Sequence, residues 1–262
     1  RRPDFREGVR RRAVRSPLVS LEAMVASYRE YDPPSELSAL VACVWENDAP
    51  VARTQLVVPD GCVDLILLSQ YELVVAGADT GPRGVSLPAG ARLSGIRLRP
   101  GAAGAVLGLP AAELRDQEVA LASIWGEKGS ILGEALAVAD RAARRELLVD
   151  AVASRGVEPD ALVLAAARKL AVSSTRVAWV AAELGVSERQ LHRRTVAAVG
   201  YGPKMLARVA RLRRLVALPD HHLATKAFAA GYASQAHMSD EVRRLTGTTP
   251  VRFLEDAAVT AA

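Results

Sequence analysis

The sequence has little cysteine and little histidine, and this scarcity excludes several classes of protein. Its 262 residues include only two cysteines, Cys43 and Cys62, which are too few to hold a secreted scaffold together by disulfides. Because no histidine precedes position 192, neither a Cys–His pair nor a histidine-containing zinc site can form in the N-terminal half. We therefore predict no metal site and no cofactor.

The sequence also lacks a long apolar run and a glycine-rich phosphate loop. No stretch approaches the roughly 20 apolar residues that cross a bilayer, so we predict no membrane contact and a cytoplasmic location. Residues 1–23 are rich in arginine and without periodicity or the apolar core of a signal peptide. We expect a leader or tail there, with patterned sequence starting at Met24. Residues 77–84 lack the spacing and the Lys-Ser/Thr pair of a nucleotide-binding loop.

Charge is distributed unevenly along the chain. From residue 160 onward there are 15 Lys and Arg against 8 Asp and Glu, whereas residues 16–159 have 12 against 19. A basic C-terminal block beside an acidic body is the pattern expected of a protein that binds a polyanion.

The N-terminal half has the pattern of short strands separated by turns such as Pro59-Asp60-Gly61. Runs rich in β-branched or alternating apolar residues lie at 40–45, 54–58, 62–68, 73–76 and 92–99. Their spacing is typical of a small antiparallel sandwich or barrel.

Beyond Pro100 the period of the apolar residues changes to that of helices. Helical segments are predicted at 102–107, 111–114, 131–138 and 141–153. Residues 156–159 break this pattern, so we predict a boundary there between a sensor or dimerisation domain (24–156) and a second domain (160–256). Asp160 is placed to cap a helix over 161–171. The predicted fold class is α+β, a small β-barrel or sandwich with appended helices followed by an all-α domain.

Residues 177–199 have the spacing of a helix-turn-helix unit. Gly185 can take the left-handed conformation that ends one helix, and Ser187 can cap the next. Ala181, four residues before the glycine, leaves room for two helices to cross closely. Leu191, four residues after the cap, can anchor the second helix to the first.

The features of this unit recur 46 or 47 residues later, which indicates an internal duplication. The corresponding small residue, glycine, cap and anchor are Ala227, Gly231, Ser234 and Met238. The turn of the second unit is one residue longer. After each unit a glycine is followed three residues later by a proline, at 200–203 and 247–250.

Residues 204–218, between the two units, are predicted to form an amphipathic linker helix. Its apolar stripe is Met205, Val209, Leu212 and Val216. Arg208, Arg211 and Arg214 lie elsewhere on the helix, either as phosphate contacts or as a solvated face. Fifteen residues give a spacer of roughly 22 Å, which could present two recognition helices to successive major grooves.

The C-terminal segment resembles the AraC/XylS family of bacterial transcription regulators. The motifs that carry the resemblance are residues 180–191, residues 231–238 and Arg243-Arg244-Leu245-Thr246-Gly247-Thr248-Thr249-Pro250. The resemblance implies double-stranded DNA as the partner and a set of base-reading positions on each recognition helix. These positions are Arg189, His192 and Arg193 in the first unit, and Gln235, Ala236 and Asp240 in the second.

The side-chain chemistry at these positions fits base recognition in the first unit better than in the second. Arginine can bind guanine O6 and N7 bidentately, and glutamine can do the same for adenine. Asp240 departs from the basic residue that many relatives have there; a carboxylate would repel phosphate or select a cytosine amine. The predicted contacts to the DNA backbone are Ser187, Arg194, Ser234, Arg243 and Arg244.

The N-terminal half resembles an uncharacterised sensor-like domain, and related domains imply a cupin-like barrel followed by helices. The residues concerned are 31–34, 37–45 and 57–66. Asp64 alternates with apolar neighbours and could face a ligand pocket in the barrel. Cys62 lies near two aspartates, so a nucleophile, a methyl-accepting cysteine or simply a buried apolar side chain remain open alternatives.

The sequence as a whole predicts a sequence-specific DNA-binding transcription regulator that is not an enzyme. We expect control by a small-molecule effector or partner at the N-terminal domain, with a homodimer and RNA polymerase as further partners. The alternatives are a nonspecific DNA-binding or protein-interaction module, or a small-molecule enzyme in the N-terminal half.

Overall fold

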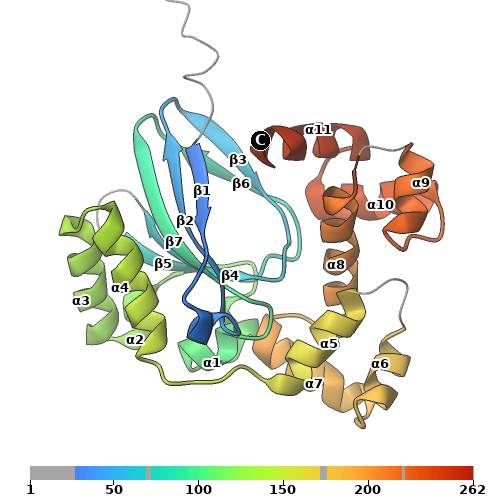
Figure 1. Ribbon diagram of the computed structural model, residues 1–262, viewed down its shortest axis with the longest axis horizontal. Coiled ribbons are helices and arrows are strands. Elements are labelled where there is room, and N and C mark those ends of the chain that lie inside the picture. The colour runs from blue at the N-terminus through green and yellow to red at the C-terminus, as the bar shows by residue number, and fades with distance from the viewer. Residues whose placement is uncertain (1–26, 69–71, 172–175, 220–221, 262) are drawn as a thin grey trace, which may run out of the picture.

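The protein consists of a β-rich half and a helical half that pack against each other (Figure 1). The computed structural model describes residues 27–68, 72–171, 176–219 and 222–261. The predicted leader at residues 1–23 lies outside these residues. Within them no helix is long and apolar enough to cross a membrane.

The N-terminal half forms a six-stranded antiparallel sheet and a separate two-stranded ribbon. In the sheet the strand order is β1 (Ser27–Tyr31), β2 (Val41–Ala49), β7 (Ala91–Leu98), β4 (Val63–Leu68), β5 (Glu72–Ala76), β8 (Glu118–Ala120). The ribbon pairs β3 (Arg53–Val57) with β6 (Arg83–Leu87). The sheet is open, since β1 and β8 form its two edges, so the fold is closer to the predicted sandwich than to a closed barrel.

Side chains point alternately to the two sides of the sheet, so its two faces have different residues. In β4, Val63, Leu65 and Leu67 are buried in the main core, whereas Asp64 and Ile66 point to the opposite side. On that opposite side a smaller apolar cluster joins the sheet to the ribbon. It consists of Cys43, Trp45, Ala49, Leu87, Ala91 and Leu93.

Two helices, α3 (Glu127–Val138) and α4 (Arg141–Ala153), cover the main-core face of the sheet (Figure 1). Asp140 caps α4 by accepting a hydrogen bond from the backbone N–H of Ala143. The buried carboxylate of Glu46 on β2 accepts a hydrogen bond from Arg145 of α4 at 2.7 Å. Because a buried charge without a partner is costly, this contact fixes where α4 lies on the sheet.

Short helical elements connect the strands and helices within the N-terminal half. They are η2 (Ser35–Leu37), α1 (Ala103–Leu107), η3 (Ala111–Leu114) and α2 (Leu121–Trp125). Residues 156–160 have no regular structure and lead from α4 to α5, close to the predicted boundary.

The helical half contains seven helices within the described residues. They are α5 (Ala161–Ala171), α6 (Val177–Glu183), α7 (Glu188–Val199), α8 (Pro203–Ala217), α9 (Leu223–Ala229), α10 (Gln235–Thr246) and α11 (Pro250–Ala261). With the sheet they confirm the predicted α+β class.

The first four of these helices share one hydrophobic core with the sheet. Leu191 of α7 and Val209 of α8 belong to the same buried cluster as Leu65 of β4. Gly104 of α1 allows the close approach, because a Cβ there would lie 2.9 Å from the carbonyl oxygen of Ala197. The end of α8 and the later helices form a separate core, which includes Leu215 of α8 with Met238 and Leu245 of α10. The first helix-turn-helix unit therefore packs in the core shared with the sheet, whereas the second packs in a core of its own.

The limits of some helices were predicted well, but α2 was not predicted and α3 begins at Glu127, before the predicted 131. The strands were predicted less completely. Helices at 141–153 and 161–171 are confirmed to the residue. Strands β1, β6 and β8 were not predicted. In β6 only Val85 and Leu87 are large and apolar, so its strand state depends on pairing with β3. The apolar stripe predicted for the linker helix also differs at its end: Leu215 is buried, whereas Val216, which was predicted to belong to the stripe, is exposed.

Candidate nucleic-acid interface

The first helix-turn-helix unit has the turn that its sequence predicts. Gly185 follows α6 with φ +68°, and the N–H of Val186 donates to the carbonyl oxygen of Ala181 at 3.0 Å. Ser187 then caps α7 in a reciprocal box: its hydroxyl accepts from the backbone N–H of Gln190, and the side-chain oxygen of Gln190 accepts from the backbone N–H of Ser187.

The second unit repeats this turn with the same hydrogen bond. Gly231 has φ +90°, and the N–H of Tyr232 donates to the carbonyl oxygen of Ala227 at 2.9 Å. Ser234 caps α10 by accepting from the N–H of His237. The anchors also correspond, since Leu191 and Met238 are both completely buried. The predicted duplication of the helix-turn-helix is confirmed.

The exposed face of α7 brings together the three residues predicted to read bases in the first unit. Arg189, His192 and Arg193 are all exposed, and neither arginine forms an ion pair within the described part of the chain. Lys204, from the start of α8, lines a cavity of about 470 Å³ together with Arg189 and His192. Lys204 was not among the predicted residues, because only the fold brings it beside α7.

His192 is restrained by its neighbour in the loop before α8. A Cβ at Gly202 would lie 2.6 Å from the imidazole, so only glycine leaves room for the ring in this place. The imidazole therefore packs against the backbone of Gly202 and lines the same cavity as Arg189.

The exposed face of α10 is different in charge. Gln235, Ala236 and Asp240 are exposed, as their predicted role requires. The carboxylate of Asp240 lies 3.8 Å from the guanidinium of Arg243 on the next turn. This pair leaves α10 with a mixed surface where α7 has a basic one.

Arg194 and Asp160 form a bidentate ion pair, with distances of 2.7 Å and 2.6 Å. Burial acts to raise the pKa of Asp160, but the hydrogen bonds from Arg194 and from backbone N–H groups of α5 outweigh it and leave the pKa below its usual value. The predicted phosphate contact would require this pair to open. The other four predicted backbone contacts remain available, with Arg243 and Arg244 exposed on α10.

The arginines of α8 form neither a row of phosphate contacts nor a solvated face. Arg208 and Arg211 donate to the two oxygens of Glu241 on α10, at 2.9 Å and 2.8 Å. Arg214 donates to the carbonyl oxygen of Ala230 at 3.2 Å. All three therefore attach the second unit to the linker helix.

Asp64, the predicted pocket residue, belongs to a polar cluster on the ribbon side of the sheet. Its carboxylate accepts from Trp45 Nε1 at 2.7 Å and from Arg97 Nε at 3.1 Å. Burial raises the pKa of this carboxyl, against the lowering effect of Arg97. A ligand here would have to displace partners that Asp64 already has.

The two cysteines have the environment of buried apolar side chains. Both are free and buried, and burial raises the pKa of the Cys62 thiol well above its usual value. Burial likewise raises the pKa of Cys43 to about 12. A protonated, inaccessible thiol is a poor nucleophile and methyl acceptor. No group of residues in the described ranges could hold a metal ion.

Comparisons with known proteins agree with this division into two parts. Residues 180–256 match a family model described as a helix-turn-helix domain, and residues 29–120 match a domain of unknown function (DUF6597). No curated protein matches the chain.

The similar solved structures include forms of ToxT from Vibrio cholerae. An apo ToxT variant is 12% identical with a TM-score of 0.43, covering 86% of this chain and 99% of that one. Wild-type ToxT bound to an unsaturated fatty acid is 13% identical with a TM-score of 0.42, covering 86% and 96%.

The fold and the match together define a two-domain protein with a helix-turn-helix DNA-binding domain at its C-terminus. That domain is of the AraC type, and the N-terminal domain belongs to DUF6597. The resemblance recognised in the sequence is thereby confirmed, and the chain is a DNA-binding transcription regulator.

Proposed function

We propose that this protein is a sequence-specific bacterial transcription regulator. Its first helix-turn-helix unit reads bases, and its second unit mainly positions the first on the DNA. The observation that carries the proposal is the exposed face of α7, where Arg189, His192 and Arg193 lie beside Glu188, the one carboxylate of this helix. Two arginines one turn apart can each bind a guanine bidentately, which gives direct recognition of sequence.

The linker helix supports this assignment. It holds α10 through ion pairs of Arg208 and Arg211 with Glu241, so α8 links the two recognition helices directly. Ser187, Ser234, Arg243 and Arg244 are proposed to contact phosphates, which sets register and affinity without sequence information. One chain thus offers two recognition helices. A homodimer and a contact with RNA polymerase stay predictions.

Control by an effector is the second part of the proposal. The sheet, α5, α7 and α8 share one hydrophobic core, so a ligand bound at the N-terminal domain can change the free energy of the helices that carry the recognition face. We propose no catalytic activity, since both thiols are buried and protonated. Action on bacterial DNA places the protein in the cytoplasm.

The proposal is tested by selecting duplexes from a random pool with the purified chain, at about 50 mM and about 200 mM salt. We expect a short enriched motif at both concentrations. In Arg189→Ala the preference at one base pair should relax, whereas Arg115→Ala, an exposed arginine of the N-terminal domain, should leave the motif unchanged. Binding without a motif, lost at the higher salt, would reduce the function to electrostatic association. The absence of any binding would overturn the proposal.

A further inference from the structure

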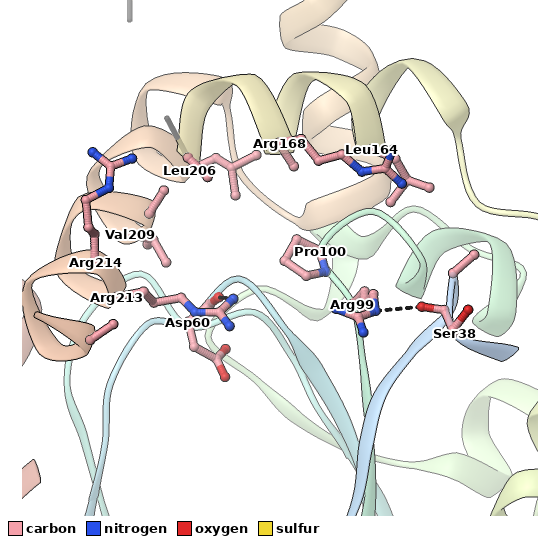
Figure 2. A pocket seen from close by; sticks show the side chains of 15 residues that line it. Ser38, Asp60, Arg99, Pro100, Leu164, Arg168, Leu206, Val209, Arg213 and Arg214 are labelled. Carbon is pink, nitrogen blue, oxygen red and sulfur yellow. Dashed lines mark hydrogen bonds between the residues drawn. The ribbon is translucent and has the colours of Figure 1, made fainter. Parts of the chain in front are cut away.

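A cavity of about 590 Å³ lies between the two halves of the molecule, away from Asp64 (Figure 2). One wall is formed by α5 and α8. The other is formed by residues of the N-terminal domain, among them Ser38, Asp60 and Pro100. Cavities of this size hold small organic ligands in other proteins.

The walls contributed by the helices are mainly apolar. Leu164 of α5, with Leu206 and Val209 of α8, lines the cavity together with several alanines, and Pro100 faces them from the N-terminal domain. Alanines keep the two helices from filling the space between them. The body of a ligand in this cavity would therefore be apolar.

Four arginines surround this apolar surface, against one carboxylate. They are Arg99, Arg168, Arg213 and Arg214, and the carboxylate is Asp60. In the described part of the chain none of the four has an ion-pair partner. Their hydrogen bonds go to backbone carbonyls: Arg99 to Ser38 and Val41, Arg213 to Asp60 at 3.5 Å and Arg214 to Ala230.

The single carboxylate is already engaged elsewhere. Asp60 accepts a hydrogen bond from the N–H of Cys62 at 2.8 Å and lies 3.6 Å from Arg97 of the sheet. The cavity is thus apolar in its walls and positive at its edge, with four guanidinium groups against the single carboxylate of Asp60. Guanidinium groups bind carboxylates, sulfonates and phosphates by charge-assisted hydrogen bonds.

We propose that this cavity binds a small amphipathic organic anion, with its charged group in the positive field to which Arg168 and Arg213 contribute and its apolar body against α5 and α8. The inference rests on the proposed effector control and places the effector between the domains, where Asp64 has no part. Such a ligand would touch the N-terminal domain, α5 and the linker helix at once. It would therefore couple the position of the second unit to ligand binding.

The test uses two fluorescent probes on the full chain without DNA: 8-anilinonaphthalene-1-sulfonate, an amphipathic anion, and N-phenyl-1-naphthylamine, which has the same ring body without the charge. We expect saturable binding of the anion at one site. In Arg168→Gln/Arg213→Gln its affinity should fall at least about tenfold, whereas the neutral probe should change by less than about threefold.

The matched control is Arg92→Gln/Arg115→Gln, which removes the same charge from exposed positions outside the cavity. It should leave binding of the anion within about twofold of the native chain. An equal loss in the control would mean that the probe follows net charge, and the proposal would fail. Absence of saturable binding would have the same consequence. Circular dichroism verifies folding, and if the double variant unfolds, Arg213→Gln alone should show about a threefold loss.

A second readout separates this inference from the proposed function. Duplex DNA at saturating concentration should change the affinity of the anionic probe by at least about threefold, since coupling between two sites is reciprocal. DNA binding without probe binding would overturn the cavity proposal and leave the regulator standing. Probe binding without DNA binding would overturn the proposed regulator function and leave the cavity proposal standing. Equal probe affinity with and without DNA would overturn the coupling to the second unit.

Discussion

The two helix-turn-helix units share the hydrogen bond of the turn after the glycine, but they differ in their surroundings and in their surfaces. The first unit packs into the core of the N-terminal domain and exposes the basic residues Arg189 and Arg193 on α7. The second has its own core, and the charges of α10 are largely paired, with Glu241 facing α8 and Asp240 beside Arg243. The two units share the backbone hydrogen bond of the turn, whereas their side chains differ: α7 exposes Arg189 and Arg193, and Glu241 of α10 binds two arginines of the linker helix.

The largest expected difference concerns the two buried anchors. Leu191→Ala and Met238→Ala should each cost about 3 kcal/mol of unfolding free energy, because both side chains are fully buried. Leu191 belongs to the core shared with the sheet, so its loss should lower protection throughout the molecule. Met238→Ala should open only the second unit. Amide hydrogen exchange measures this, and equal loss of protection in the sheet of both variants would contradict separate cores.

Base recognition should also differ between the units. Arg189→Ala should cost about 2 kcal/mol of binding free energy and relax specificity at one base pair. Gln235→Ala should cost less than about 1 kcal/mol, because α10 contributes mainly position. Titration of duplexes that carry each base pair at each site of the motif measures both. A larger loss for Gln235→Ala would reverse the assignment of roles.

The attachment of the second unit should depend on acidity. Burial acts to raise the pKa of Glu241, but the hydrogen bond and charge of Arg211 and the charge of Arg208 outweigh it, so the folded pKa lies below the usual value. Stability from this contact is therefore present above pH of about 4.3 and is lost as pH falls through the folded pKa.

The variant Glu241→Gln tests this contact. We expect it to lower the stability of the second unit by about 1 kcal/mol at neutral pH and to weaken its acid dependence. Hydrogen exchange of α9 and α10 at pH 7 and near pH 4 provides the measurement. Asp160→Asn is the counterpart in the first unit and should leave the acid response of α10 unchanged.

The smallest expected effect is at Asp240. Because its exposed carboxylate faces the proposed DNA side, Asp240→Asn should tighten binding to all duplexes by about twofold. Binding to specific and unrelated duplexes at several salt concentrations checks this. A loss confined to duplexes with cytosine at one position would instead show that the carboxylate accepts from a base.

The turns and helix starts of this protein were predictable because they depend on neighbouring residues. Gly185 and Gly231 supply positive φ, and Ser187 and Ser234 cap the helix that follows. Such interactions span at most a few positions, so a spacing of 46 or 47 residues was enough to identify two units. The set of exposed candidate residues on α7 followed from the same local register.

The partners of several charged residues were not predictable in this way. Arg194 was expected to contact phosphate and is bound to Asp160, 34 positions away. Arg208 and Arg211 were left open between two surface roles and instead bind Glu241. Lys204 was missed beside His192. In each case the partner is far away in the sequence, and periodicity carries no information on which distant side chain will face a given position.

The amino-acid sequence by itself thus determined the helix-turn-helix duplication, the α+β class and the basic character of the C-terminal third, since these follow from local conformation and composition. Only the tertiary structure decided that the sheet is open, that the first unit shares a core with it and that an arginine-lined cavity lies between the halves. Those features arise where segments distant in the chain are brought into contact by burial of apolar surface, and that burial favours compactness without specifying which segments meet.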